Sequence, residues 1–276
     1  MDDILAGLLS PTTLVLPAGA QRIDNAPRIY TIDNTNHVLK AGSSVKLSEA
    51  EAMRFVSRTT NIPVPQVHES YILTDHGYIY MDHVHGRPLS QIWAHLSPDQ
   101  RGSLVSQLRE IFKELSSLRG DFFGALWNQP SLDVFFIHLP FLDVKLSYGP
   151  FKTRLEYNRG LVDALRNARP GNFLDDLDQD LVEQLHRLTD DTKVFSHGDL
   201  HPGNILVDEQ THRITGIIDW EGAGFSVRGR EYFEAKSRAR NLEWSAALDE
   251  IFDEEERKPF ELFQQLNQAL TRYTCV

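Results

Sequence analysis

Cysteine, long apolar runs and a basic N-terminal segment are scarce or absent in this sequence, and each shortage excludes a class of protein. The single cysteine among the 276 residues is Cys275, which excludes an internal disulfide and favours a reducing compartment. No run approaches the roughly 18 apolar residues that a membrane-spanning helix needs. The chain starts with Met1-Asp2-Asp3, without the positive charge that opens a secretory signal. We therefore expect a cytoplasmic protein that does not interact with a membrane.

Lysine and arginine are also scarce relative to aspartate and glutamate. The sequence has 28 Lys and Arg against 39 Asp and Glu, which gives a formal net charge of -11 at pH 7. This balance argues against nucleic acids and anionic membranes as partners. It is compatible with a cationic small molecule as a partner, although many soluble proteins are equally acidic. The length suits one two-lobed unit with a sizeable core.

The most informative stretch runs from residue 194 to residue 224 and reads VFSHGDLHPGNILVDEQTHRITGIIDWEGAG. Its two β-branched runs, 204–207 and 214–218, flank a polar turn, which predicts a β-hairpin. Polar residues stand at both ends of this hairpin, namely His197, Asp199, His201, Asn204 and Asp219. The hairpin would therefore bring two carboxylates and an amide together at one end.

The spacing of these groups fits phosphoryl transfer. Four residues separate Asp199 from Asn204, as in the kinase pattern H-R-D-x-x-x-x-N, where the Asp is the base and the Asn holds a metal. Asp219 stands where that pattern has a later Asp that binds Mg²⁺, a cation that prefers oxygen ligands.

Two other interpretations use the same residues. His197, Asp199 and His201 form an H-x-D-x-H pattern that could bind zinc in a metallohydrolase, although this leaves Asn204 and Asp219 unexplained. Alternatively, the two Asp residues could simply cap turns at the ends of strands.

The string HGDLHPGNILVD followed by IIDW resembles the aminoglycoside phosphotransferase and choline kinase family. The aromatic-rich segment 121–151, which includes Phe141 and ends in Gly149-Pro150-Phe151, looks like an insertion of fungal-type members. The resemblance implies an α+β, protein-kinase-like fold with two lobes. The nucleotide-binding lobe would cover residues 1–84, with a small antiparallel sheet and one helix, and a larger, mainly helical lobe would cover residues 85–276.

The resemblance also implies an activity and the roles of the hairpin residues. The protein would be an ATP-dependent phosphotransferase that moves the γ-phosphate to a hydroxyl of a small molecule, with Mg²⁺ as cofactor and GTP as the alternative nucleotide. Asp199 would orient and deprotonate the acceptor hydroxyl, and Asn204 and Asp219 would hold the metal. His197 would brace the loop.

A nucleotide site follows from the same resemblance. Lys40 ends the second strand of a hairpin predicted over 29–32 and 37–40, where it would contact the α- and β-phosphates. A helix is predicted from Ser48, with Glu51 completing a capping box. We expect Glu51 to pair with Lys40, and Glu49 is the alternative. A third hairpin, over 71–73 and 78–81, leads to a hinge.

At this hinge, the Asp82 carbonyl and the Val84 N–H would bind the adenine edge. The sequence departs from the kinase pattern before Lys40, because no G-x-G-x-x-G is present there. Related small-molecule kinases often have a degenerate loop here, so ATP is not excluded. The missing glycines keep open an alternative, a catalytically silent relative that binds nucleotide or a partner as a scaffold.

The second half of the chain is predicted to be helical. Ser97 and Gln100 form a capping box before an apolar stripe that ends before Gly120, and two further helices are expected over 154–168 and 175–188. The acidic run 249–256 is either a site for a cationic acceptor or a solvated helix face. Three tryptophans could face a quaternary ammonium, but core packing explains them equally well: Trp127, Trp220 and Trp244.

Overall fold

The computed structural model describes residues 14–24, 26–137 and 146–273. The first residues, Met1-Asp2-Asp3, as well as Phe141 and Cys275, lie outside the described residues. Among the described residues, no helix is both long enough and apolar enough to cross a membrane.

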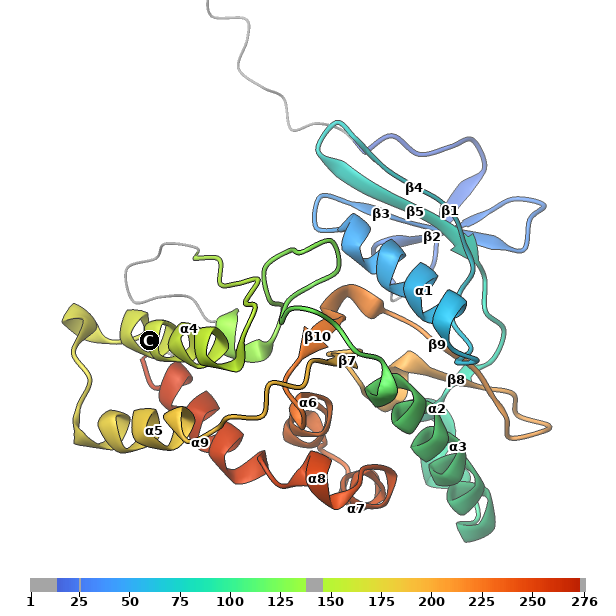
Figure 1. Ribbon diagram of the computed structural model, residues 1–276. Coiled ribbons are helices and arrows are strands. Elements are labelled where there is room, and N and C mark those ends of the chain that lie inside the picture. The colour runs from blue at the N-terminus through green and yellow to red at the C-terminus, as the bar shows by residue number, and fades with distance from the viewer. Residues whose placement is uncertain (1–13, 25, 138–145, 274–276) are drawn as a thin grey trace, which may run out of the picture.

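An antiparallel sheet and one helix form the first part of the chain (Figure 1). The strands follow the order β1-β2-β3-β5-β4, and α1 packs against β4 and β5. Their bounds are β1 Ala20–Arg22, β2 Ile29–Ile32, β3 His37–Gly42, α1 Leu47–Thr59, β4 Val67–Leu73 and β5 His76–Asp82. The two predicted hairpins are confirmed. Their turns place Asn34, Thr74 and Asp75 at positive φ, a conformation that Asn and Asp tolerate well.

The start of α1 differs from the prediction. The helix begins at Leu47, and Lys46 precedes it without a capping side chain. Ser48 therefore lies inside the helix and the predicted capping box is wrong. The buried face is formed by Glu49, Met53 and Val56, which recur at the i, i+4, i+7 spacing of one helical stripe.

The second part of the chain is mainly helical and contains two small sheets (Figure 1). The sheets have the orders β6-β8-β9 and β10-β7. Its helices are α2 Leu89–Ile92, α3 Pro98–Ser117, α4 Arg154–Asn167, α5 Asp176–His186, α6 Arg230–Arg238, α7 Leu242–Ile251, α8 Glu254–Arg257 and α9 Phe260–Thr271. Its strands are β6 Arg87–Pro88, β7 Val194–Ser196, β8 Ile205–Val207, β9 Ile214–Ile217 and β10 Gly224–Ser226.

Three local predictions for this part are confirmed. Ser97 and Gln100 form the capping box of α3, with both reciprocal hydrogen bonds present. The helices α4 and α5 lie within the predicted ranges, and β8 and β9 form the predicted hairpin.

Among the described residues, two large apolar clusters form most of the core, and a small third one consists of Leu39, Ala41 and Tyr78. The first is continuous between the two parts of the molecule, because it joins α1 and β5 to the β8–β9 hairpin and to Trp220 and Trp244. The second is rich in aromatic residues of the segment 121–151 and of helices α4, α6 and α9. Most of these aromatic side chains are therefore packing groups, as are Trp220 and Trp244, whereas Trp127 is 60% exposed.

Two helical glycines provide a test of this packing. A Cβ at Gly160 in α4 would lie 2.4 Å from Cζ of Phe151, whereas a Cβ at Gly102 in α3 would meet nothing within 4 Å. Gly102→Ala should raise the free energy of unfolding by about 0.5–1 kcal/mol, because alanine favours the helix. Gly160→Ala should lower it by about 1–3 kcal/mol through overpacking. Urea unfolding of both variants measures these effects, and a stabilised Gly160→Ala protein would contradict this packing.

Candidate active site

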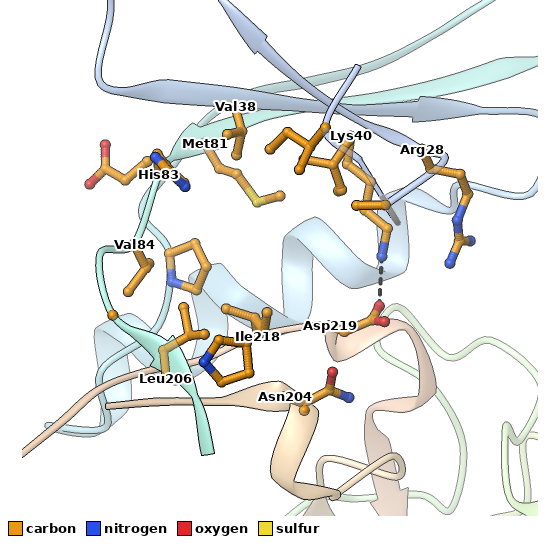
Figure 2. A pocket seen from close by; sticks show the side chains of 18 of the residues that line it. Arg28, Val38, Lys40, Met81, His83, Val84, Asn204, Leu206, Ile218 and Asp219 are labelled. Atoms are coloured by element: carbon orange, nitrogen blue, oxygen red, sulfur yellow. Dashed lines mark hydrogen bonds and ion pairs between the residues drawn. The ribbon is translucent and has the colours of Figure 1, made fainter. Parts of the chain in front are cut away.

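A cavity of ≈ 630 Å³ lies between the sheet and the helical part of the molecule. Val38 and Met81 enter it from the sheet, and Leu206 and Ile218 face them from the β8–β9 hairpin (Figure 2). Two apolar layers that face each other in this way can bind a flat ring between them. The cavity is also lined by five of the predicted site residues, Lys40, Asp82, Val84, Asn204 and Asp219.

Lys40 lies at one end of this cavity and is only 3% exposed. Its Nζ lies 2.7 Å from Oε1 of Glu49. It also lies 2.6 Å from Oδ1 of Asp219, the contact that Figure 2 marks with a dashed line. Oε2 of Glu221 is 3.6 Å away, and this carboxylate also accepts a hydrogen bond from Arg28 at 2.9 Å. The ammonium group therefore joins the sheet, α1 and the segment after β9.

The predicted pairing of Glu51 with Lys40 is wrong, and Glu49 forms this pair. Glu51 instead forms an ion pair with Arg54 on the same helix. The two glutamates differ by two positions, which is about 200° around a helix. Glu49 shares the buried stripe of Met53, so Glu51 is turned away from Lys40.

The charges at Lys40 shift one another's pKa. Burial opposes the charged form of Lys40, but Glu49 and Asp219 outweigh it and raise the pKa of the ammonium. Burial raises the pKa of Glu49 to about 6, and Lys40 limits this rise. Burial also acts to raise the pKa of Asp219, but the attraction of Lys40 prevails and lowers it. Asp219 is therefore an ionised carboxylate at neutral pH, as a cation ligand must be.

Asp199 lies next to Asn204 in the loop before β8. The Asn204 Nδ2 donates to the Asp199 carbonyl at 2.9 Å and to its Oδ2 at 3.2 Å. Arg238 of α6 donates to Oδ1 of Asp199 at 2.9 Å. Burial raises the pKa of Asp199, and it outweighs the opposite effects of Arg238 and His201. Asp199 is thus a partly buried carboxylate held by two neighbours.

His197 is completely buried and braces this loop. Its Nε2 lies 3.0 Å from the Ile218 carbonyl, and its Nδ1 accepts from the Asp199 N–H at 3.2 Å. Burial lowers the pKa of His197 to about 4, so the ring is neutral. Backbone groups occupy both ring nitrogens, which argues against the alternative interpretation of His197, Asp199 and His201 as a zinc site.

A buried ionic network supports the same loop from α6. Glu231 accepts hydrogen bonds from the N–H groups of His197 and Gly198. Gly198 has φ 78°, and a Cβ there would lie 2.4 Å from both Nη2 of Arg230 and the Gly222 carbonyl, so glycine is required. Sequence reasoning missed Arg238 and Glu231, because their contacts with the loop span more than 30 residues of chain.

The fold and the site together define a protein of the protein-kinase-like class, with a lysine–carboxylate pair facing an Asp–Asn loop. The model of the phosphotransferase enzyme family matches residues 41–264, which is most of the chain. The chain belongs to this family.

Curated relatives and a solved structure agree with this membership. The chain is 30% identical over 182 residues to aminoglycoside 3'-phosphotransferase of Streptomyces ribosidificus and 28% identical over 201 residues to that of Streptomyces fradiae. These matches cover 62% and 71% of the chain, but 57% and 64% of the relatives.

The solved structure is an aminoglycoside phosphotransferase from Streptomyces rimosus in complex with ADP and streptomycin. It superposes with a TM-score of 0.56 at 17% identity and covers 92% of this chain and 93% of that chain. This likeness confirms the predicted protein-kinase-like fold.

The buried carboxyl of Glu231 provides a pH test of the loop. Burial raises its pKa to about 7, ahead of the opposing attraction of Arg230. Its contribution to stability is therefore complete below the ordinary pKa of 4.5 and is lost as the pH rises through 7. Glu231→Gln resembles the protonated acid, so its stability relative to wild type should increase by on the order of 3 kcal/mol between pH 4.5 and 7.5.

Urea unfolding of both proteins across this pH range measures the difference. The opposite pH dependence of His197, whose pKa is lowered to about 4, is present in both proteins and cancels. A difference that stays constant with pH would contradict a protonated Glu231.

Proposed function

We propose that this protein is an ATP-dependent small-molecule kinase that transfers the γ-phosphate to a hydroxyl group. The observation that carries the proposal is Lys40, held between Glu49 and Asp219 at the end of a cavity of nucleotide size. Phosphoryl transfer depends mainly on positioning and charge stabilisation, which is what such a buried ammonium and carboxylate can supply.

The nucleotide would enter between the two apolar layers of the cavity. The Asp82 carbonyl and the Val84 N–H would bind the base edge, and Lys40 would contact the α- and β-phosphates. ATP is favoured over GTP because the Streptomyces rimosus enzyme was solved with ADP. In this proposal residues 1–84 form the nucleotide-binding lobe, and residues 85–276 form the lobe that carries the acceptor site.

Asn204 and Asp219 are the residues that would hold Mg²⁺. The Asn204 amide nitrogen donates to Asp199, which leaves the amide oxygen as the atom available to a cation. Asp219 adds an ionised oxygen donor, and this oxygen-only set suits Mg²⁺. When bound, Mg²⁺ would neutralise phosphate charge during transfer.

Asp199 would act as the base for the acceptor. Its carboxylate would accept the proton of the hydroxyl while the acceptor oxygen bonds to the γ-phosphorus and the bond to the ADP oxygen breaks. Arg238 would hold this carboxylate in place through its 2.9 Å hydrogen bond. Such general bases contribute about 10²–10⁴-fold to a reaction rate.

For the acceptor, we propose a cationic small molecule. The two curated relatives and the Streptomyces rimosus complex support an aminoglycoside or another cationic acceptor. Two members of the acidic run 249–256 have other contacts, since Asp249 bonds Lys236 at 2.6 Å and Glu256 accepts from the Gly229 N–H. We further propose a cytoplasmic protein, which the single cysteine supports.

ATP consumption with Mg²⁺ over an acceptor panel tests the proposal. The panel holds aminoglycosides, choline, ethanolamine, amino acids and simple sugars. We expect one class to stimulate turnover and Asp199→Asn to reduce kcat by about 10²–10⁴-fold. Nucleotide binding without turnover on any acceptor would favour a catalytically silent scaffold.

A matched pair of variants tests the role of the lysine's partner. Glu49→Gln should reduce kcat/KM by roughly 100-fold, because a misplaced Lys40 no longer positions the phosphates. Glu51→Gln, on the same helix and with its ion pair to Arg54, should stay within about twofold of wild type. Steady-state kinetics with ATP measures both. Equal losses in the two variants would contradict the assignment of Glu49.

A further inference from the structure

Two histidines and an aspartate form a second polar cluster, where the sheet leads into the helical part. The cluster consists of His37, His68 and Asp82, and each residue offers one ligand atom within 4.8 Å of the others. Nε2 of His68 lies 2.7 Å from Oδ1 of Asp82, and Nε2 of His37 lies 3.6 Å from the same oxygen. The two imidazole rings are 4.6 Å apart between centroids.

The sheet brings these residues together from three adjacent strands. β5 lies between β3 and β4, and His37 of β3 is the direct cross-strand partner of Asp82 at the end of β5. The register of β4 shifts between Val67 and Glu69, so His68 is the extra residue of a β-bulge. Bulges re-aim side chains, and this one directs His68 to Asp82. The three-residue arrangement therefore depends on the strand register and on the bulge.

We propose that His37, His68 and Asp82 form a binding site for a divalent transition metal, with Zn²⁺ as the ion that fits best. Imidazole nitrogen and carboxylate oxygen are common zinc ligands, whereas Mg²⁺ prefers oxygen alone. Tetrahedral zinc with bonds of about 2.0–2.1 Å separates its ligand atoms by about 3.3 Å. The observed separations of 2.7 Å and 3.6 Å bracket this value. Water would take the fourth position.

A fourth residue orients one of the ligands. Nδ1 of His37 lies 2.7 Å from the Tyr80 hydroxyl. When the Nδ1–H donates to this oxygen, Nε2 of His37 has a free lone pair and faces Asp82. Metal-binding histidines usually have such an outer partner on the second ring nitrogen.

The site is partly open to solvent, as an exchangeable metal requires. The side chains of His37, His68 and Asp82 are 32%, 33% and 40% exposed. The metal would connect β3, β4 and β5 at Asp82, which is the last residue of β5. We therefore expect bound Zn²⁺ to raise the Tm of the protein.

Zn²⁺ titration of the tag-free full chain tests the site, with a chromophoric chelator as competitor and excess Mg²⁺ present. We expect one equivalent of Zn²⁺ and a higher Tm. Tyr80→Phe should weaken binding by about 10–100-fold. His68→Gln and His37→Gln each remove a ligand and should weaken it further. The controls are His85→Gln, which is near the site, and His186→Gln, which is far from it. Both should bind Zn²⁺ with the affinity of the wild type.

Three results would overturn the assignment. The first is no stoichiometric Zn²⁺ binding by a wild-type protein whose thermal unfolding is cooperative. The second is binding that His68→Gln and His37→Gln leave unchanged. The third is a loss in His85→Gln as large as in His68→Gln. Since the measurement uses no nucleotide, its failure would leave the proposed kinase activity untouched.

Discussion

The buried ammonium group of Lys40 is the contact on which the arrangement of this molecule depends. A charge that is only 3% exposed is costly unless it is paired, and the partners come from separate elements, Glu49 from α1 and Asp219 from the segment after β9. Removing either carboxylate would leave the positive charge of Lys40 incompletely balanced inside the protein. The three groups therefore fix the sheet against the β8–β9 hairpin, and they do so at the end of the cavity where phosphate charge would be placed.

A second buried ionic network, centred on Arg230 and its neighbour Glu231, supports the loop around Asp199. Arg230 is 1% exposed, and it contacts Asp133 at 3.0 Å, Glu234 at 3.0 Å and the Gly222 carbonyl at 2.8 Å. Burial opposes the charge of Arg230, but these carboxylates outweigh it and raise its pKa. The loop that carries Asp199 is thus supported by buried charged residues of the helical part, whereas Lys40 belongs to the sheet. The cavity lies where these two supports meet.

Local signals in the sequence predicted much of this arrangement. The hairpins, the Ser97 cap and the Asp199–Asn204 spacing depend on residues close in the chain, and each was readable there. The partner of Lys40 could not be predicted in this way. The start of α1 decides which of its faces points inward, and the predicted start was wrong. Arg238 could not be predicted either, since it reaches Asp199 only through tertiary packing 39 residues away.

Asp219, which is paired with Lys40 in this structure, is the carboxylate that we propose as a ligand of the metal accompanying the nucleotide. Calorimetric titration of ATP with and without Mg²⁺ tests it most directly, in the wild-type protein and in Asp219→Asn. We expect Mg²⁺ to strengthen ATP binding by the wild type and most of this gain to disappear in the variant. An Asp219→Asn protein that keeps the full gain from Mg²⁺ would contradict it.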